Sequence, residues 1–291
     1  MEQYFRVKDF SPEELEKWHE KLLEDLVYFR DFCEVHNLRF FLSAGTLLGA
    51  IRHKGFIPWD GDIDVQMPRA DYDKLVDLWD KYADKSKFRC ERTDKNMCIR
   101  YPMTVVRNVN STCILSHSVN DDICQGVKID IEFLDGVPKG KLAIKINEVC
   151  AMFLALLRTE RLPNYSSKSK RLVSKIILTI FPTHRIRWEV SKLFENRLKK
   201  FDFDGDYEYV RFLGTPLRKK SAYSSVVYAD FEGYKMPIPV GYDEILKAYY
   251  GDYMQLPPVE KRYSDIANIV FYDLDNCYLK YKGIHYCVNR K

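Results

Sequence analysis

The chain has 291 residues, 46% of them hydrophobic and 14% aromatic, which excludes a disordered protein and allows one large core with a smaller lobe. Its charges nearly balance at a formal +4, which excludes a protein that binds nucleic acid through a global positive field. Eight cysteines without CxxC or zinc-knuckle spacing, and an N-terminus without an apolar signal core, predict free thiols and a cytoplasmic location.

Helices and strands alternate in the first half of the chain. A long helix is predicted from Ser11, a helix-capping residue followed by Pro12 and Glu14, to about His36, because apolar residues recur at helical spacing. Beyond this helix, the pattern predicts strands over 39–43, 62–67, 97–109, 112–116 and 126–133, and helices over 44–53 and 69–82.

The composition changes at Lys139. Residues 139–200 contain fifteen Lys and Arg against four Glu, interleaved with apolar runs such as AMFLALL, which is typical of helices with a basic face. We therefore predict a mixed α/β (α+β) fold, in which a core sheet with flanking helices carries a basic helical insertion. The predicted divisions are a core (1–138), a basic helical lobe (139–205) and a C-terminal segment (206–291).

Two aspartates in the run PWDGDIDVQM give the strongest chemical signal. Alternation along the predicted strand places Asp62 and Asp64 on one face, while Ile63 and Val65 face the core. An isolated Asp-x-Asp is most often a solvated strand edge. Two carboxylates held this close need a cation, however, and their oxygens suit a divalent metal ion.

A second element sits about sixteen residues upstream of the aspartates. There, a predicted strand is followed by the run Ser43-Ala44-Gly45-Thr46 at a helix start, where free amides and the helix dipole favour an anionic phosphate. A strand, a helix start made of small residues and then an acidic strand is the arrangement that a nucleotidyltransferase-type site needs. The two elements together favour a metal site over a solvated edge.

A third carboxylate would complete a site of this kind. In the run GVKIDIEFLDG, apolar residues alternate with charged ones, so Asp130 and Glu132 share the polar face of a strand that could lie beside the first. Spacing alone does not choose between them, and an ordinary salt bridge is the alternative role for at least one.

Basic and aromatic residues near these acids are candidates for binding a phosphorylated donor. The candidates for compensating diphosphate charge are Arg52, Lys54, Arg107 and Arg262. His53 is a candidate general base because imidazole accepts a proton near neutral pH, with charge pairing or loop packing as the alternative role. Trp59, beside the aspartate pair, would stack on a nucleotide base or hold the loop, and surface solvation is the alternative for Arg107 and Arg262.

Three motifs together resemble the LicD family. They are FLSAGTLLGAIRHKGFIPWDGDIDVQMPRADYDKL, KIDIEFLDGVP, and YGDYMQLPP followed by Lys261 and Arg262. That family includes bacterial phosphocholine transferases, and fukutin-type ribitol-phosphate transferases are its relatives. The resemblance implies a nucleotidyltransferase-like fold and a Mg²⁺ site, with Mn²⁺ as the alternative. It also implies transfer of phosphocholine or a related phospho-alditol from a CDP-activated donor to a glycan hydroxyl, with CMP leaving.

The resemblance also implies roles for individual residues. Asp62 and Asp64 fall on the metal pair, and Asp130 fits the third carboxylate better than Glu132 does. Gly61 departs from the family pattern, which often has an aspartate there. Two other classes of function remain open: a true nucleotidyltransferase that attaches the nucleotide itself, and a non-catalytic binder of nucleotides or glycans.

The basic region 139–200 suggests a membrane partner. Its apolar stretch LVSKIILTIF is about ten residues, far short of the roughly twenty that span a bilayer. Flanked by lysines and arginines, the stretch could instead lie in the interface of an anionic membrane. The resemblance to the LicD family implies that a glycan acceptor would be carried by a lipid at the cytoplasmic face. An ordinary helical lobe with a solvated basic face is the alternative.

Overall fold

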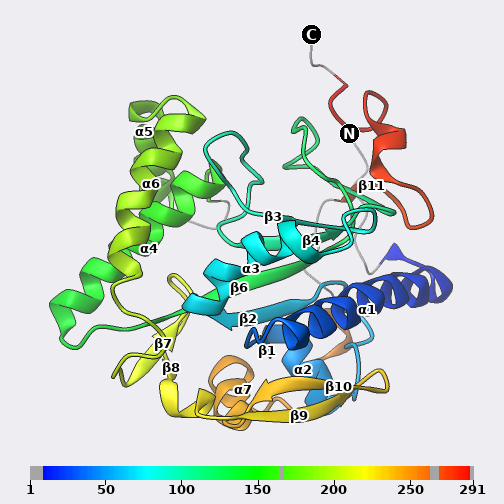
Figure 1. The fold of residues 1–291 in the computed structure, drawn as a ribbon, viewed down its shortest axis with the longest axis horizontal. Helices are drawn as coiled ribbons and strands as arrows, with labels where there is room; N and C mark the ends of the chain where they lie inside the picture. The colour runs from blue at the N-terminus through cyan, green and yellow to red at the C-terminus, as the bar shows by residue number, and fades with distance from the viewer. Residues whose placement is uncertain (1–8, 164–166, 263–268, 289–291) are drawn as a thin grey trace.

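A mixed β-sheet lies at the centre of the protein in the computed structural model, which describes residues 9–163, 167–262 and 269–288 (Figure 1). The strands are ordered β1 (Phe41–Leu42), β2 (Asp64–Pro68), β6 (Lys128–Gly136), β4 (Thr104–Asn108) and β3 (Phe88–Glu91), with β7 (Tyr209–Arg211) and β8 (Arg218–Lys219) extending from β6. Strands β2 and β6 are parallel, and the other neighbours in this sheet are antiparallel. The predicted α/β class, a core sheet with flanking helices, is confirmed.

Helices α1 (Pro12–Val35) and α3 (Arg69–Tyr82) pack against each other on one face of this sheet. Trp79 of α3 contacts three rings of α1, those of Tyr28, Phe29 and Phe32. The predicted start of α1 is confirmed, since the Ser11 hydroxyl accepts a hydrogen bond from the Glu14 amide while the Glu14 carboxylate accepts one from the Ser11 amide. The alternation predicted for β6 is also confirmed, because its apolar residues Ile129, Ile131 and Phe133 are buried.

A second group of elements packs beside β1 and β2 (Figure 1). It consists of α2 (Ala44–Arg52), α7 (Tyr242–Tyr250), the hairpin of β9 (Val226–Phe231) and β10 (Tyr234–Pro239), and the short 3₁₀ helix η2 (Lys220–Tyr223). Helix α2 contacts β2, α7 and β9, so it joins the acidic strand to the C-terminal part of the chain.

The basic region folds into three helices, α4 (Lys141–Thr159), α5 (Lys168–Ile180) and α6 (His184–Leu198). Helices α4 and α6 pack against each other, whereas α5 has no buried residue. Within the described ranges, no helix is long and apolar enough to cross a membrane.

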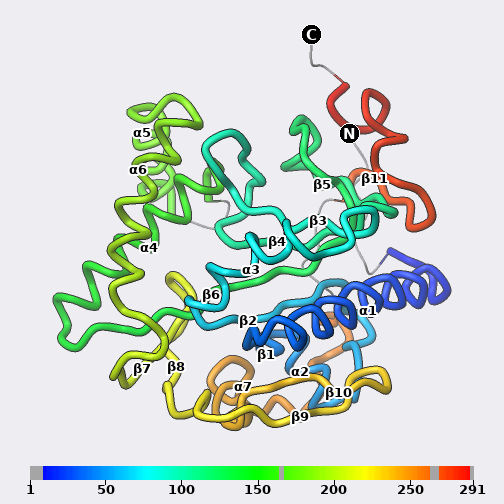
Figure 2. Tube along the Cα trace, viewed as in Figure 1, coloured from blue at the N-terminus to red at the C-terminus, as the bar shows by residue number. Residues whose placement is uncertain are grey.

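The structure differs most clearly from the predicted strands at β4 and β3. The predicted strand 97–109 is shortened to β4, because Arg100 has a left-handed backbone (φ 67°) and Pro102 lacks an amide hydrogen. Strand β3 was not predicted, and its short run Phe-Arg-Cys-Glu gives little signal. Strand β5 (Thr112–Leu115) pairs with β11 (Ile269–Asp273), far along the chain, as Figure 2 shows. The remaining 3₁₀ helices are η3 (Val259–Lys261) and η4 (Tyr278–Tyr281).

Candidate active site

The loop before β2 is fixed by two aromatic side chains of α1. The Trp18 indole Nε1 donates a hydrogen bond to the Gly61 carbonyl at 2.8 Å, and His19 Nε2 lies 2.7 Å from the Asp60 carbonyl oxygen. Asp62 therefore belongs to this loop and lies just outside the strand in which it was predicted. Its neighbour Ile63 is fully buried, so the expected alternation of core and polar residues still holds through the loop.

The small residues at the start of α2 position the acidic segment. The Ser43 amide donates to the Asp64 carbonyl at 2.9 Å, and the Asp64 amide donates to the Thr46 hydroxyl at 2.9 Å. A Cβ atom at Gly45 would collide with the carboxylate of Asp60. Ser43 and Thr46 thus hold the acidic strand by hydrogen bonds, and Gly45 gives Asp60 room beside the helix start.

The pairing of β2 with β6 separates the two candidates for the third acid. Asp64 is the register partner of Asp130, and Gln66 is the partner of Glu132. The Gln66 side-chain amide donates to the Glu132 carboxylate at 2.6 Å. Asp130 therefore lies directly beside Asp64, whereas Glu132 lies two register pairs further along the strands with a hydrogen-bond partner of its own.

The charge around these aspartates is only partly compensated. Burial, and next the nearby charge of Asp60, raise the pKa of Asp62 to about 8. Burial and the charge of Asp62 likewise raise the pKa of Asp64 well above its ordinary value. Lys128 pairs with Oδ2 of Asp130, but Oδ1 of Asp130 is buried without a hydrogen-bond partner among the described residues. An unpartnered carboxylate oxygen beside two mutually repelling carboxylates fits a divalent cation.

The acids are not drawn into a tight cluster. In the described part of the chain, the only three His, Cys, Asp or Glu side chains whose ligand atoms lie within 4.8 Å of one another are Cys98, Glu160 and His184. There, Glu160 already binds His184 Nδ1 at 2.6 Å and Arg187 at 2.7 Å, so this second cluster is explained by ion pairing.

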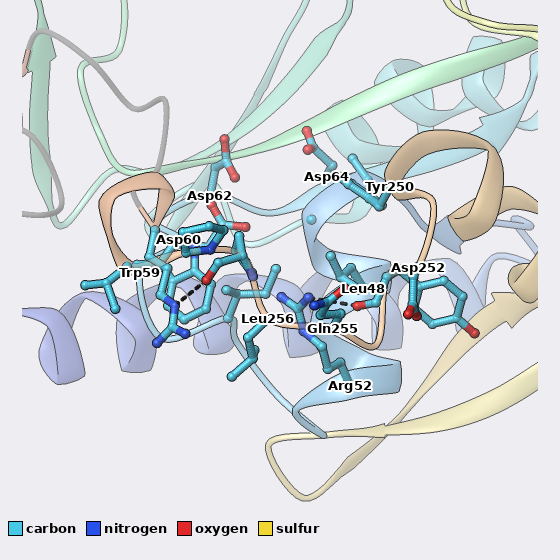
Figure 3. A pocket seen from close by; sticks show the side chains of 18 residues that line it. Leu48, Arg52, Trp59, Asp60, Asp62, Asp64, Tyr250, Asp252, Gln255 and Leu256 are labelled. Carbon is cyan, nitrogen blue, oxygen red and sulfur yellow. Dashed lines mark hydrogen bonds between the residues drawn. The ribbon is translucent and has the colours of Figure 1, made fainter.

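A cavity of about 860 Å³ opens beside the acidic loop (Figure 3). It is lined on one side by residues of α2 and the acidic loop, and on the other by the segment that begins at the end of α7. The charged and aromatic lining residues are Arg52, Trp59, Asp60, Asp62, Asp64, Tyr250, Asp252, Tyr253 and Arg262. In Figure 3, the side chains of Asp62 and Asp64 point to the same side, away from Arg52 and Leu256.

Four of the predicted donor-binding residues line this cavity: Gly45, Arg52, Trp59 and Arg262. Arg262 lies over the ring of Trp59, with its guanidinium carbon 5.3 Å from the ring centre. Arg52 Nη1 donates to the Tyr253 carbonyl at 2.8 Å, which ties α2 to the C-terminal segment. The cavity therefore presents two guanidinium groups and an indole ring close to the acids.

His53 and Lys54 lie outside the lining of the cavity. His53 Nε2 accepts a hydrogen bond from Arg52 Nε at 2.9 Å, which occupies the lone pair that a general base would use. Burial, and next the charge of Arg52, lower the pKa of His53. Lys54 is exposed, and its carbonyl accepts from the Glu232 amide.

The structure does not place Arg107 where it could bind a phosphorylated donor, the role predicted for it. Its side chain is 2% exposed, donates to the Gly126 carbonyl at 3.0 Å and lies 3.4 Å from a carboxylate oxygen of Glu91. It is neither on the cavity wall nor solvated at the surface, the two roles considered for it. Because strand β3 was not predicted, Glu91 could not be recognised from sequence as the partner of Arg107 in the strand next to β4.

Four of the charged and aromatic lining residues were not among the predicted site residues: Asp60, Tyr250, Asp252 and Tyr253. Burial, followed by the charges of Asp64 and Asp60, raises the pKa of the Tyr250 hydroxyl, so this residue is electrostatically coupled to the acids. The aromatic and acidic run YYGDY was a usable signal. Its proximity to the acids could not be read from it, because about 190 residues separate the two segments.

Comparisons with known proteins support the resemblance seen in the motifs. Residues 37–127 match the family model described as LicD/FKTN/FKRP, nucleotidyltransferase domain. The chain is 29% identical over 256 residues to lipopolysaccharide cholinephosphotransferase LicD of Haemophilus influenzae, a match that covers 82% of this chain and 90% of that protein.

More distant similarity extends to mammalian proteins. Ribitol 5-phosphate transferase FKRP of Homo sapiens is 31% identical over 90 residues, which are 26% of this chain and 18% of FKRP. The mouse protein of the same name matches to the same extent. The match to FKRP thus covers less than a fifth of that protein, whereas the match to the bacterial relative covers most of both chains.

Proposed function

Since residues 37–127 carry the nucleotidyltransferase domain of the LicD family, we propose that this protein is a transferase of substituted phosphate groups. Its reaction would move phosphocholine, or a related phospho-alditol, from a CDP-activated donor to a hydroxyl group of a cell-surface glycan or teichoic-acid precursor. The acceptor oxygen would bond to the donor's distal phosphorus, the bond from that phosphorus to the bridging oxygen would break, and CMP would leave. The observation that carries this proposal is the cavity whose lining includes Asp62 and Asp64 together with the Arg262–Trp59 guanidinium–indole pair.

We assign Mg²⁺, with Mn²⁺ as the alternative, to Asp62, Asp64 and Asp130. The ion, when bound, would supply positive charge to the diphosphate and to the leaving CMP. The unpartnered Oδ1 of Asp130 and its register next to Asp64 support this assignment. Because the aspartates repel one another, the site is suited to a cation rather than to a neutral ligand.

Residues of the chain itself would bind and orient the donor. Arg262 would contact phosphate oxygens while its guanidinium stays over Trp59, and the Trp59 ring offers a face for the cytosine base. Arg52 would add a second positive charge from α2. We place the proton of the acceptor hydroxyl on a carboxylate of the cavity, because the free lone pair of His53 is already used by Arg52.

We further propose that residues 1–138 form the catalytic core, that 139–205 form a basic helical lobe, and that 206–291 complete the site. The support for the last part is that residues 250–262 line the same cavity as residues 44–64. A true nucleotidyltransferase is the alternative function, because the matched domain bears that description.

A panel of CDP-activated donors with Mg²⁺ tests the proposal, with CMP and pyrophosphate measured separately. We expect CMP release that depends on both a CDP-linked donor and a glycan acceptor. Pyrophosphate released from CTP would favour the alternative nucleotidyltransferase reaction. Donor binding without turnover, across donors with choline, ribitol and other head groups, would identify a non-catalytic binder instead.

A further inference from the structure

Helix α5 presents an apolar stripe to solvent. Leu172, Val173, Ile176 and Ile180 are 59%, 54%, 50% and 64% exposed, although aliphatic side chains of this size are usually buried. Three of them follow one another at intervals of four residues, so they lie on one side of the helix. The side chains of α5 that are more covered belong to Ser174, Ile177 and Leu178. The helix therefore rests on the protein through one side and leaves an aliphatic side free.

The same helix carries four positive charges and no acid: Lys168, Lys170, Arg171 and Lys175. None of the four forms an ion pair with any residue in 9–163, 167–262 or 269–288. By helical periodicity, Lys168 and Lys175 border the apolar stripe on one side and Lys170 borders it on the other. Three of these cations occupy the first turn, where positive charge opposes the helix dipole. They consequently do not serve to stabilise the helix.

Arg187, which follows α5, does not belong to this set of free cations. Its guanidinium group binds the Glu160 carboxylate at 2.7 Å and donates to the Leu178 and Phe181 carbonyls at the end of α5. It fixes the end of α5 in place.

We infer that α5 is an in-plane helix that docks the protein on an anionic lipid surface. An aliphatic stripe bordered by lysines matches a bilayer interface, in which the apolar side chains enter the acyl region and the ammonium groups reach the lipid phosphates. Thirteen residues of helix extend about 20 Å, too short to span the roughly 30 Å of hydrocarbon. A second copy of the chain fits this face poorly, because pairing two such helices would bring their cations together.

The position of α5 agrees with a docking role. Figure 1 shows α5 at the outer end of the α4–α6 helices, away from α2 and α7, which border the cavity. Docking through α5 would leave the cavity open to a donor from the aqueous side. The inference does not depend on the proposed reaction, and each can fail without the other.

Co-sedimentation of the full chain with vesicles tests this inference. We expect the protein to pellet with vesicles that contain phosphatidylglycerol, to pellet less as salt rises, and to stay in the supernatant with phosphatidylcholine alone. Salt should matter because it screens the attraction between lysines and lipid phosphates. Equal amounts in the supernatant with both kinds of vesicle at low salt would overturn the inference.

The decisive variant reverses three charges, Lys168→Glu, Lys170→Glu and Arg171→Glu. Each cation lost near an anionic surface weakens binding about fivefold, so the apparent vesicle affinity should fall by about 100-fold. The variant should remain folded, because glutamates in the first turn favour the helix dipole. Its melting temperature and its CMP release from donor and acceptor in solution report on folding and activity.

A matched control reverses three exposed lysines elsewhere, Lys17→Glu, Lys74→Glu and Lys95→Glu, which changes the net charge by the same amount. This control should bind vesicles nearly as well as wild type, and an equal loss would show that only net charge matters. Leu172→Ser with Ile176→Ser should also weaken binding. Sedimentation equilibrium that finds a dimer which this apolar variant dissociates would favour a second copy of the chain and refute lipid docking.

Discussion

Asp62→Asn is expected to make the metal-free protein more stable while it removes metal binding. The pKa of Asp62 is raised from an ordinary 3.8 to about 8, so the folded state binds this proton more tightly than the unfolded chain. The free energy of unfolding of wild type therefore falls as pH rises from about 4 to about 8. Asp62→Asn does not show this fall, because its side-chain amide does not titrate. For a fully buried group, this difference in pKa between the folded and unfolded states corresponds to roughly 6 kcal/mol of lost stability. Because Asp62 keeps partial contact with water, we expect about 2 kcal/mol.

Thermal unfolding with and without Mg²⁺ measures this effect. At pH 9 in the presence of a chelator, Asp62→Asn should melt about 5 °C above wild type, and the gain should shrink toward zero near pH 4. Mg²⁺ should raise the melting temperature of wild type but not that of the variant. Turnover should fall by about a thousandfold, which corresponds to several kcal/mol of lost charge stabilisation. A variant with normal turnover, or with an unchanged response to Mg²⁺, would refute this reasoning.

Three further predictions concern the surroundings of the acids. Asp130→Asn should reduce turnover nearly as much as loss of Asp62, whereas Glu132→Gln should retain most activity, since Glu132 lies two register pairs away. Gly45→Ala should cost about 1–3 kcal/mol of stability and lower turnover, because its methyl group would displace a neighbouring carboxylate, whereas the control Gly214→Ala meets no atom within 4 Å. Arg262→Ala should raise KM for the donor about tenfold or more, with Arg262→Lys in between.

Each of these predictions has a contrary outcome. If Glu132→Gln lost more activity than Asp130→Asn, the strand pairing would not identify the third metal ligand. Equal melting temperatures for the two glycine variants would contradict the close approach of Asp60 to α2. If Arg262→Ala lowered kcat without changing KM, the proposal that Arg262 binds the donor would be wrong. Arg262 would then interact with the reacting groups only in the transition state.

Local features of the chain were predictable because their physical causes are local. The capping box at Ser11 and the apolar period after it predicted α1, and the period-two alternation around Ile129 predicted β6. Both signals arise from residues only a few positions apart. Where local signals conflicted or were short, as at Arg100 and in β3, the prediction failed.

The sequence by itself determined the fold class, the resemblance to the LicD family and the two aspartates Asp62 and Asp64 of the cavity wall, because these follow from composition, periodicity and contiguous motifs. Only the tertiary structure decided that Asp130 lies beside Asp64, that Arg107 pairs with Glu91, and that residues 250–262 close the same cavity. These outcomes depend on strand register and on packing between segments far apart in the chain. No local pattern encodes such distances, since they emerge only when the whole core is buried together.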